Sequence, residues 1–210
     1  MAFPTRLEAE QFFEEVISCR NASAFPFLPQ KENAYRTHCL AVAKHAEKIA
    51  AETPSLNADH AYVMGLLHDC GRIKDEKGEN THHGWVGYEL MMKKGWNEIA
   101  RICITHNFFE KDFDISSYPQ SRDDLFKCKN FLAAIEYDDY DKLVMLADLL
   151  NDMGRDCTLE YRLNSLASRY PIPPQTIARF LTILKQHYAY FSAQCGTDLY
   201  NLLGIKNDLS

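Results

Sequence analysis

An imidazole and a carboxylate stand side by side at the end of an apolar stretch, at His68 and Asp69. The seven residues before them, 61–67, carry no charge, so the pair ends a segment that is expected to be buried. Burying either group without a partner is costly, and a bound cation would satisfy both. A hydrogen bond between the two side chains is the alternative, but it leaves Asp148, inside the apolar run 143–150, unexplained.

Other nitrogen and oxygen ligands are spread along the chain. Together with His68 and Asp69 they give six ligand side chains, one of which is a carboxylate that two ions can share. A pair of divalent metal ions requires a set of this kind. Asp69 is best placed to bridge two ions, because a carboxylate has two ligand oxygens whereas a neutral imidazole offers one nitrogen. Mixed imidazole and carboxylate ligands suit iron, manganese, cobalt, nickel or zinc. The candidate metal ligands are His38, His68, Asp69, His83, His106 and Asp148.

Three basic residues follow the candidate ligands closely. Arg72 and Lys74 come just after Asp69, and Arg155 lies about two turns beyond Asp148. Such side chains can hold a phosphate group beside a metal centre, and arginine favours bidentate contacts with phosphate. We predict phosphate binding by all three and a catalytic role for Arg72 alongside Asp69, with an ordinary surface position as the alternative for each.

Apolar residues recur at helical spacing almost throughout, and no segment alternates as a strand would, so we predict an all-α fold. Gly71 is expected to end the helix that carries His68 by adopting a left-handed conformation. The helical pattern lapses between Asn107 and Asp124, and this segment is a candidate lid or substrate wall. Including caps, the expected helices span residues 7–19, 33–52, 57–69, 81–95, 97–106, 125–136, 141–153, 159–168 and 174–194.

Composition limits the classes of function. The 210 residues are enough for one domain, and the net charge of −6 argues against a broad surface for nucleic acid. The seven cysteines are scattered singly, which favours reduced thiols and a cytoplasmic protein. No apolar run approaches the roughly 20 residues of a membrane span, and the N-terminus lacks the pattern of a secretory signal. We therefore expect no nucleic-acid or membrane partner.

The order His38, His68-Asp69, Asp148 resembles the signature of the HD-domain superfamily, whose members are mostly metal-dependent phosphohydrolases of all-helical fold. The resemblance covers residues 33–155 and extends to the flanking segments 37–43, 65–72 and 146–148. It implies that these four side chains bind one metal. It also implies a helical bundle with a core at about 33–155, on which the N-terminal helix 7–19 and the C-terminal helices 159–194 pack to form a single domain.

Two further histidines resemble the second-metal ligands of some HD proteins. The segment from His83 to Gly87 is similar to their His-x-x-x-Gly segment, and this spacing favours His83 over its neighbour His82. His106, in Ile-Thr-His, resembles the next ligand. We assign both to a second ion that shares Asp69. His45 lies two turns after His38 on about the same helix face, but the HD pattern does not require it.

Among two-metal HD proteins, the chain is similar to bacterial hydrolases of diadenosine tetraphosphate, in which an arginine follows the distal aspartate. It departs from them at Arg72, where lysine is frequent, and over residues 107–124. The resemblance implies a small nucleotide or related phosphate ester or anhydride as substrate, and homodimers.

Two other functions fit the same ligands. A di-iron oxygenase similar to myo-inositol oxygenase shares the ligand order and the fold. A non-catalytic sensor of metal or nucleotide is the third hypothesis, although the chain contains no second domain to receive its signal. The basic residues Arg72, Lys74 and Arg155 favour hydrolysis.

Overall fold

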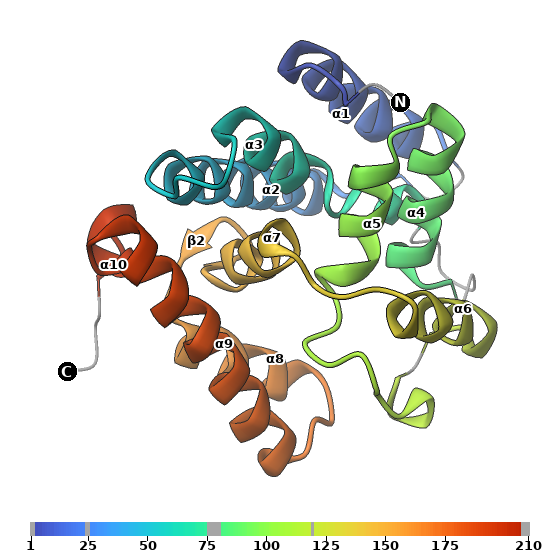
Figure 1. The fold of residues 1–210 in the computed structure, drawn as a ribbon. Coiled ribbons are helices and arrows are strands. Elements are labelled where there is room, and N and C mark those ends of the chain that lie inside the picture. The colour runs from blue at the N-terminus through green and yellow to red at the C-terminus, as the bar shows by residue number, and fades with distance from the viewer. Residues whose placement is uncertain (1–2, 24–25, 75–80, 119, 207–210) are drawn as a thin grey trace.

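The computed structural model describes residues 3–23, 26–74, 81–118 and 120–206, and these form ten α-helices, two 3-10 helices and one short hairpin (Figure 1). The all-α prediction is confirmed. The elements are α1 Arg6–Asn21, α2 Pro29–Ala51, α3 Ala58–Leu67, η1 Cys70–Lys74, α4 His83–Lys94, α5 Asn97–Thr105, η2 Ile115–Ser117, α6 Arg122–Ala133, α7 Asp139–Leu149, β1 Asn151–Asp152, β2 Arg155–Asp156, α8 Leu159–Arg169, α9 Pro174–Cys195 and α10 Leu199–Leu203.

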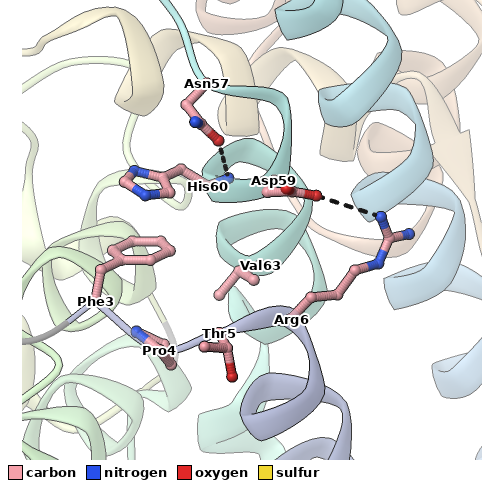
Figure 2. Close-up of a pocket in the computed structure, with 8 residues that line it drawn as sticks. All are labelled: Phe3, Pro4, Thr5, Arg6, Asn57, Asp59, His60 and Val63. Atoms are coloured by element: carbon pink, nitrogen blue, oxygen red, sulfur yellow. Dashed lines mark hydrogen bonds and ion pairs between the residues drawn. The ribbon is translucent and has the colours of Figure 1, made fainter.

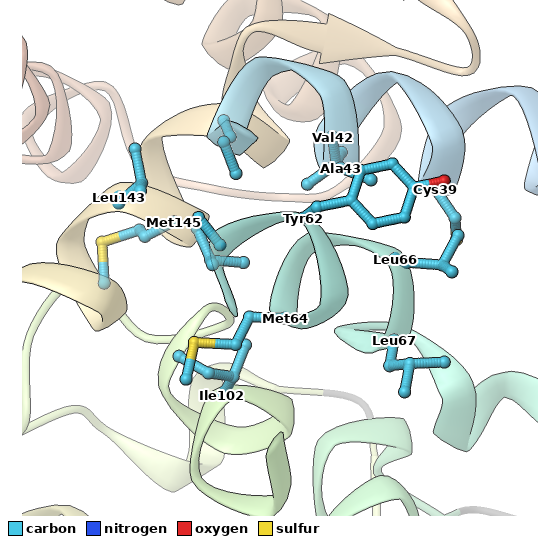
Figure 3. Packing of buried hydrophobic residues seen from close by; sticks show 14 of the residues in the cluster. Cys39, Val42, Ala43, Tyr62, Met64, Leu66, Leu67, Ile102, Leu143 and Met145 are labelled. Atoms are coloured by element: carbon cyan, nitrogen blue, oxygen red, sulfur yellow. The ribbon is translucent and has the colours of Figure 1, made fainter. Parts of the chain in front are cut away.

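Helix α3 lies at the centre of the core, in contact with α1, α2, α5 and α7. After its first turn, residues 61–67 are all uncharged and buried, as expected for a helix segment that is covered on every side. Figure 3 shows its Met64 beside Ile102 of α5, with Leu143 and Met145 of α7 nearby. Because α3 is enclosed, the residues that follow its last turn, His68 and Asp69, are held at a fixed position inside the protein.

Glycine allows α2 and α3 to approach closely. A Cβ atom at Gly65 would lie 2.8 Å from the Cα of Ala43, a distance that real Cβ contacts do not reach. The two helices therefore touch through their backbones at this point. This contact lies about one turn from His68 on α3 and between one and two turns from His38 on α2.

Helices α5 and α7 are joined by a buried ion pair at the start of α7. Asp141 is fully buried and accepts hydrogen bonds from Arg101 Nε at 3.0 Å and from Thr105 Oγ1 at 2.8 Å. Asp141 also completes a capping box with Asp138, which fixes where α7 begins. The link to Thr105 ends one residue before His106, so it helps to set the position of that histidine relative to α7.

The structure differs from the predicted elements where α7 ends. The expected helix 141–153 stops at Leu149, and Asn151–Asp152 pairs with Arg155–Asp156 as an antiparallel hairpin. Met153 and Gly154 form its turn with positive φ angles of 53° and 92°. The sequence around this glycine gives the same signal for the end of a helix as for a tight turn. The prediction of no strands was therefore wrong over these few residues.

Three aromatic rings of the segment 107–124, those of Phe108, Phe113 and Tyr118, pack into a second, smaller core. Phe108 and Phe113 are buried and stack with ring centroids 4.3 Å apart, against Leu125 and Leu132 of α6. Phe108 also stacks on His82, so the segment reaches the first residues of α4. The interpretation as a lid or substrate wall stays a prediction.

The C-terminal helices pack on the side of the bundle that carries α7. Helix α9 contacts α7, α8 and α10, and α10 contacts α2 (Figure 1). In the part of the chain that the structure describes, no helix combines the length and apolarity needed to cross a bilayer.

Candidate metal centre

Five elements bring the predicted ligands together. His38 comes from α2, His68 and Asp69 from the end of α3, and the others from α4, α5 and α7. In the described residues the ligand atoms form two groups, each within 4.8 Å, and the two groups share Asp69. The first group contains His38, His68 and Asp69, and the second contains Asp69, His83 and His106. Asp148 adjoins the first group, with its Oδ1 atom 3.0 Å from His38 Nε2.

Hydrogen bonds determine which ring nitrogen of the histidines carries the proton. His68 Nδ1 lies 2.7 Å from the carbonyl oxygen of Gly65, and His106 Nδ1 lies 2.8 Å from that of Ile102. A carbonyl oxygen only accepts, so each Nδ1 must donate. In the neutral ring, Nε2 then carries a lone pair. Arg72 Nη2 lies 3.4 Å from Nε2 of His83 and can only donate, which assigns a lone pair to that nitrogen as well.

These Nε2 atoms face carboxylate oxygens. Those of His83 and His106 lie 3.2 Å and 3.5 Å from Asp69 Oδ1. Nε2 of His68 and Oδ1 of Asp69 are buried and have no hydrogen-bond partner among the residues that the structure describes. A lone pair that faces a carboxylate oxygen inside a protein is repulsive, and it becomes attractive when a cation lies between the two atoms. The ligand set therefore fits divalent metal ions.

The protonation states also suit metal binding. Burial lowers the pKa of His68 to about 4, so its ring is neutral near pH 7. Burial acts to raise the pKa of Asp69, but the positive charge of Arg72 outweighs it and holds the pKa well below its usual range. For Asp148, burial is outweighed by the hydrogen bond from His38, and the pKa is lowered. Burial acts to lower the pKa of His38, but Asp148 outweighs it and raises the pKa, so a metal ion that binds between the two side chains displaces a proton from His38 Nε2. Neutral imidazoles and ionised carboxylates are the forms that ligate metals.

The metal-free protein is expected to lose stability as the pH falls from about 6.5 towards 4. In that window the unfolded chain protonates His68, whose ordinary pKa is 6.5, while the folded chain keeps it neutral. The free energy of unfolding is therefore unaffected by His68 above pH 6.5. As the pH falls below 6.5, it decreases by up to about 1.4 kcal/mol per pH unit. Urea unfolding with a chelator at several pH values measures it. His68→Gln should give a shallower dependence, and equal slopes would contradict this prediction.

Gly71 brings η1 against the start of α4. Its φ angle is not positive, so the expected left-handed helix end was wrong. A Cβ atom here would lie 1.9 Å from the carbonyl oxygen of His83 and 2.5 Å from the backbone nitrogen of Gly87. Glycine is needed for close approach rather than for an unusual conformation. The contact places His83 next to Asp69, two residues before Gly71.

The neighbouring histidines have other contacts. His82 is buried, accepts a hydrogen bond from the backbone of Gly84 at 3.2 Å, and caps α4. His45 places Nε2 3.2 Å from Asp156 Oδ1 and belongs to neither group of ligand atoms. The geometry thus favours His83 over His82, as the spacing of the sequence does.

The predicted phosphate-binding residues are placed differently from one another. Arg72 donates from Nε to Asp69 Oδ2 at 2.6 Å, at the edge of the cluster. The side chain of Lys74 lies outside the described residues. Arg155 is exposed, and its guanidinium lies over the ring of Tyr161.

Two residues that the sequence patterns did not single out lie beside His38 and Asp148. Arg162 of α8 places Nη2 3.9 Å from Asp148 Oδ1, and its side chain is 11% exposed. Asn151 of β1 is fully buried, with Oδ1 3.1 Å from His38 Nδ1. Asn151 had one available signal, its place three residues after Asp148, but it fell inside an expected helix. Nothing in the spacing links Arg162 to Asp148.

A surface pocket lies at the other end of α3 (Figure 2). It is lined by the N-terminal segment from Phe3 to Arg6 and by the first residues of α3. His60 stacks on Phe3 with ring centroids 3.9 Å apart. Its lining reaches along α3 as far as Val63, between one and two turns before His68, and it includes none of the candidate metal ligands. It is therefore distinct from the candidate metal centre.

Comparison with known proteins agrees with the ligand pattern. The family model for the HD domain matches residues 35–153, more than half of the chain. The matched span contains all six candidate ligands. No curated protein and no solved structure matches the chain.

Proposed function

Because the chain belongs to the HD domain family, we propose that it is a metal-dependent phosphohydrolase with two divalent transition-metal ions. Its substrate is a small nucleotide or a related phosphate ester or anhydride. The first ion is held by His38, His68 and Asp148, the second by His83 and His106, and Asp69 is shared by both.

One observation carries this proposal: the buried Nε2 atoms of His83 and His106 carry lone pairs and face the same carboxylate oxygen of Asp69. A structural ion pair would place a proton between the ring and Asp69, but burial lowers the pKa of His83, which disfavours its protonated form. Two bound ions would lower the pKa of a shared water and neutralise charge on phosphoryl oxygens. That chemistry requires ligands arranged around a common carboxylate, and Asp69 belongs to both groups of ligand atoms.

Two guanidinium groups flank the cluster at different carboxylates. Arg72 contacts Asp69 at one end, and its side chain is 37% exposed, so it reaches the surface. Arg162 lies near Asp148 at the other end, where Asp152 orients it by accepting from Nη1 at 2.6 Å. We propose that both donate hydrogen bonds to phosphate oxygens of the substrate. Arg162 therefore takes the phosphate-binding role near Asp148 that the sequence predicted for Arg155.

Replacing either arginine by lysine is expected to weaken substrate binding more than metal binding. Lysine keeps the charge but loses the planar pair of donors. We expect Arg72→Lys and Arg162→Lys each to lower kcat/KM about 10-fold to 100-fold, mainly through KM. Steady-state kinetics with matched metal content measure this. Arg155→Lys is the control, and an effect there as large as at Arg162 would contradict the assignment.

The function is tested with the purified full chain, stripped of metal and reloaded with Mn²⁺, Co²⁺, Zn²⁺ or Fe²⁺. Each preparation is assayed for release of phosphate or nucleotide from a panel of phosphomonoesters, nucleotides and dinucleoside polyphosphates. Turnover that depends on metal and is lost in Asp69→Asn supports the proposal. Oxygen consumption by the iron-loaded protein, without phosphate release, would indicate the oxygenase. Tight nucleotide binding without turnover would indicate a sensor.

A further inference from the structure

A chain of hydrogen bonds leads away from His38 on the side opposite the metal ligands. Nδ1 of His38 faces Asn151 Oδ1 at 3.1 Å. Asn151 in turn donates from Nδ2 to Asp156 Oδ1 at 2.9 Å. The same oxygen lies 3.2 Å from Nε2 of His45. Asn151 therefore connects the ring of His38 to the half-exposed carboxylate of Asp156, which also contacts His45, and none of these three residues is a proposed metal ligand.

The orientation of the Asn151 amide is fixed from two sides. Oδ1 accepts a hydrogen bond from the backbone nitrogen of Gly154 at 2.8 Å, and Nδ2 donates to the carboxylate of Asp156. A flipped amide would place donor against donor at Gly154 and oxygen against oxygen at Asp156. Oδ1 therefore faces His38. Because an amide oxygen only accepts, His38 must donate from Nδ1.

The fold builds this arrangement from two elements. In the hairpin, Asn151 and Asp156 are direct partners across β1 and β2, so backbone pairing holds their side chains next to each other. His38 and His45 lie two turns apart on one face of α2, so the same helix supplies both ends of the chain. His45, which the HD pattern does not require, thereby has a structural partner beside the cluster.

We propose that Asn151, held by Asp156 and His45, is a positioning residue for the first metal ion. It imposes on His38 the tautomer with the proton on Nδ1, which leaves the Nε2 lone pair for the ion shared with Asp148. In the other tautomer Nε2 carries the proton and cannot ligate. This inference rests on the proposed function, because it assumes a metal ion between His38 and Asp148.

Replacing Asn151 should lower the affinity for the first ion only. His68 and His106 have their tautomers fixed by backbone carbonyl oxygens of their own helices, which no side-chain replacement removes. The tautomer of His38 depends on a side chain from a different element. Loss of a partner that orients a ligating histidine typically lowers metal affinity about 10-fold to 100-fold. We expect that loss at one ion and little change at the other.

Titration of the metal-stripped full chain with Co²⁺ tests this inference. Isothermal calorimetry gives the number of ions and their affinities, and the visible absorption of Co²⁺ reports changes in its ligands. Asn151→Leu removes the acceptor at similar size, and we expect one ion to bind about 10-fold to 100-fold more weakly. Asp156→Ala removes the partner of Asn151 at a half-exposed site, and we expect a smaller loss of affinity at the same ion than in Asn151→Leu.

Two further variants separate positioning from general stability. Asp156→Asn keeps an oxygen that accepts from Asn151 and should restore most of the affinity that Asp156→Ala loses. Asp112→Ala removes a carboxylate that is 95% exposed and pairs with Lys129, away from the ligand cluster, and should leave both affinities unchanged. A purely structural role would lower the melting temperature without changing the Co²⁺ spectrum or the number of bound ions.

Circular dichroism establishes which variants fold. If Asn151→Leu does not fold, the affinities of Asp156→Ala and Asp156→Asn decide whether Asn151 positions His38. The inference is overturned when a folded Asn151→Leu protein, or failing that Asp156→Ala, binds two ions with wild-type affinities and spectrum. A wild-type chain that binds no Co²⁺ would overturn the proposed function as well. The wild-type titration therefore distinguishes the two failures.

Discussion

Asp69→Asn is expected to remove both metal ions and to lower turnover by about three orders of magnitude or more, because the proposed reaction depends on the two ions together. Asp69 belongs to both groups of ligand atoms, and Oδ1 lies within 3.5 Å of two histidine Nε2 atoms. The amide has the same shape, but it lacks the negative charge and offers one ligand oxygen instead of two. Elemental analysis after dialysis and a phosphate-release assay measure the two effects.

The control for this prediction is the same substitution outside the cluster. Asp139→Asn changes a partly buried carboxylate at the start of α7, which pairs with Lys142 and accepts from Tyr190. It should keep both ions and nearly full activity. If Asp69→Asn retained two ions, the shared-carboxylate assignment would be wrong. If it lost the ions but kept its activity, the proposed metal-dependent hydrolysis would be wrong.

Gly71→Ala is expected to destabilise the protein by about 3 kcal/mol and to disrupt the second metal site, because overpacking against a rigid neighbour has effects of this size. The added methyl group would meet backbone atoms of His83 and Gly87, and backbone cannot rotate away as a flexible side chain can. The start of α4 must shift, which moves His83 away from Asp69. Urea unfolding of the metal-free protein and Co²⁺ titration measure both effects.

Gly95→Ala separates this steric clash from the general effect of losing a glycine. Gly95 ends α4 with a φ angle of 75°, and a Cβ atom there would have nothing within 4 Å. Alanine at this position should lower stability by about 1 kcal/mol through backbone strain alone and leave both metal ions bound. Equal losses at the two glycines, with both ions retained in each variant, would show that close packing at Gly71 does not position His83.

Local patterns in the sequence predicted much of the fold. Helical spacing of apolar residues reports which face of a segment is buried, and the fully apolar run before His68 predicted an enclosed helix, which α3 is. The prediction failed at residues 151–156, where a glycine after an apolar helix gave the same local signal for a helix end as for a hairpin turn. Whether a helix ends in a loop or in a hairpin depends on the tertiary contacts of the residues that follow it.

The chain by itself determined the chemistry of the candidate centre, because the residue types and their order specify imidazole and carboxylate ligands. Only the tertiary structure decided which neighbouring side chains contact these ligands. Asn151 reaches His38 across 113 positions of sequence, and Arg162 rather than Arg155 approaches Asp148. Periodicity encodes burial of a face, whereas a contact between side chains depends on how separate helices and a hairpin are packed together, and that packing has no local signature.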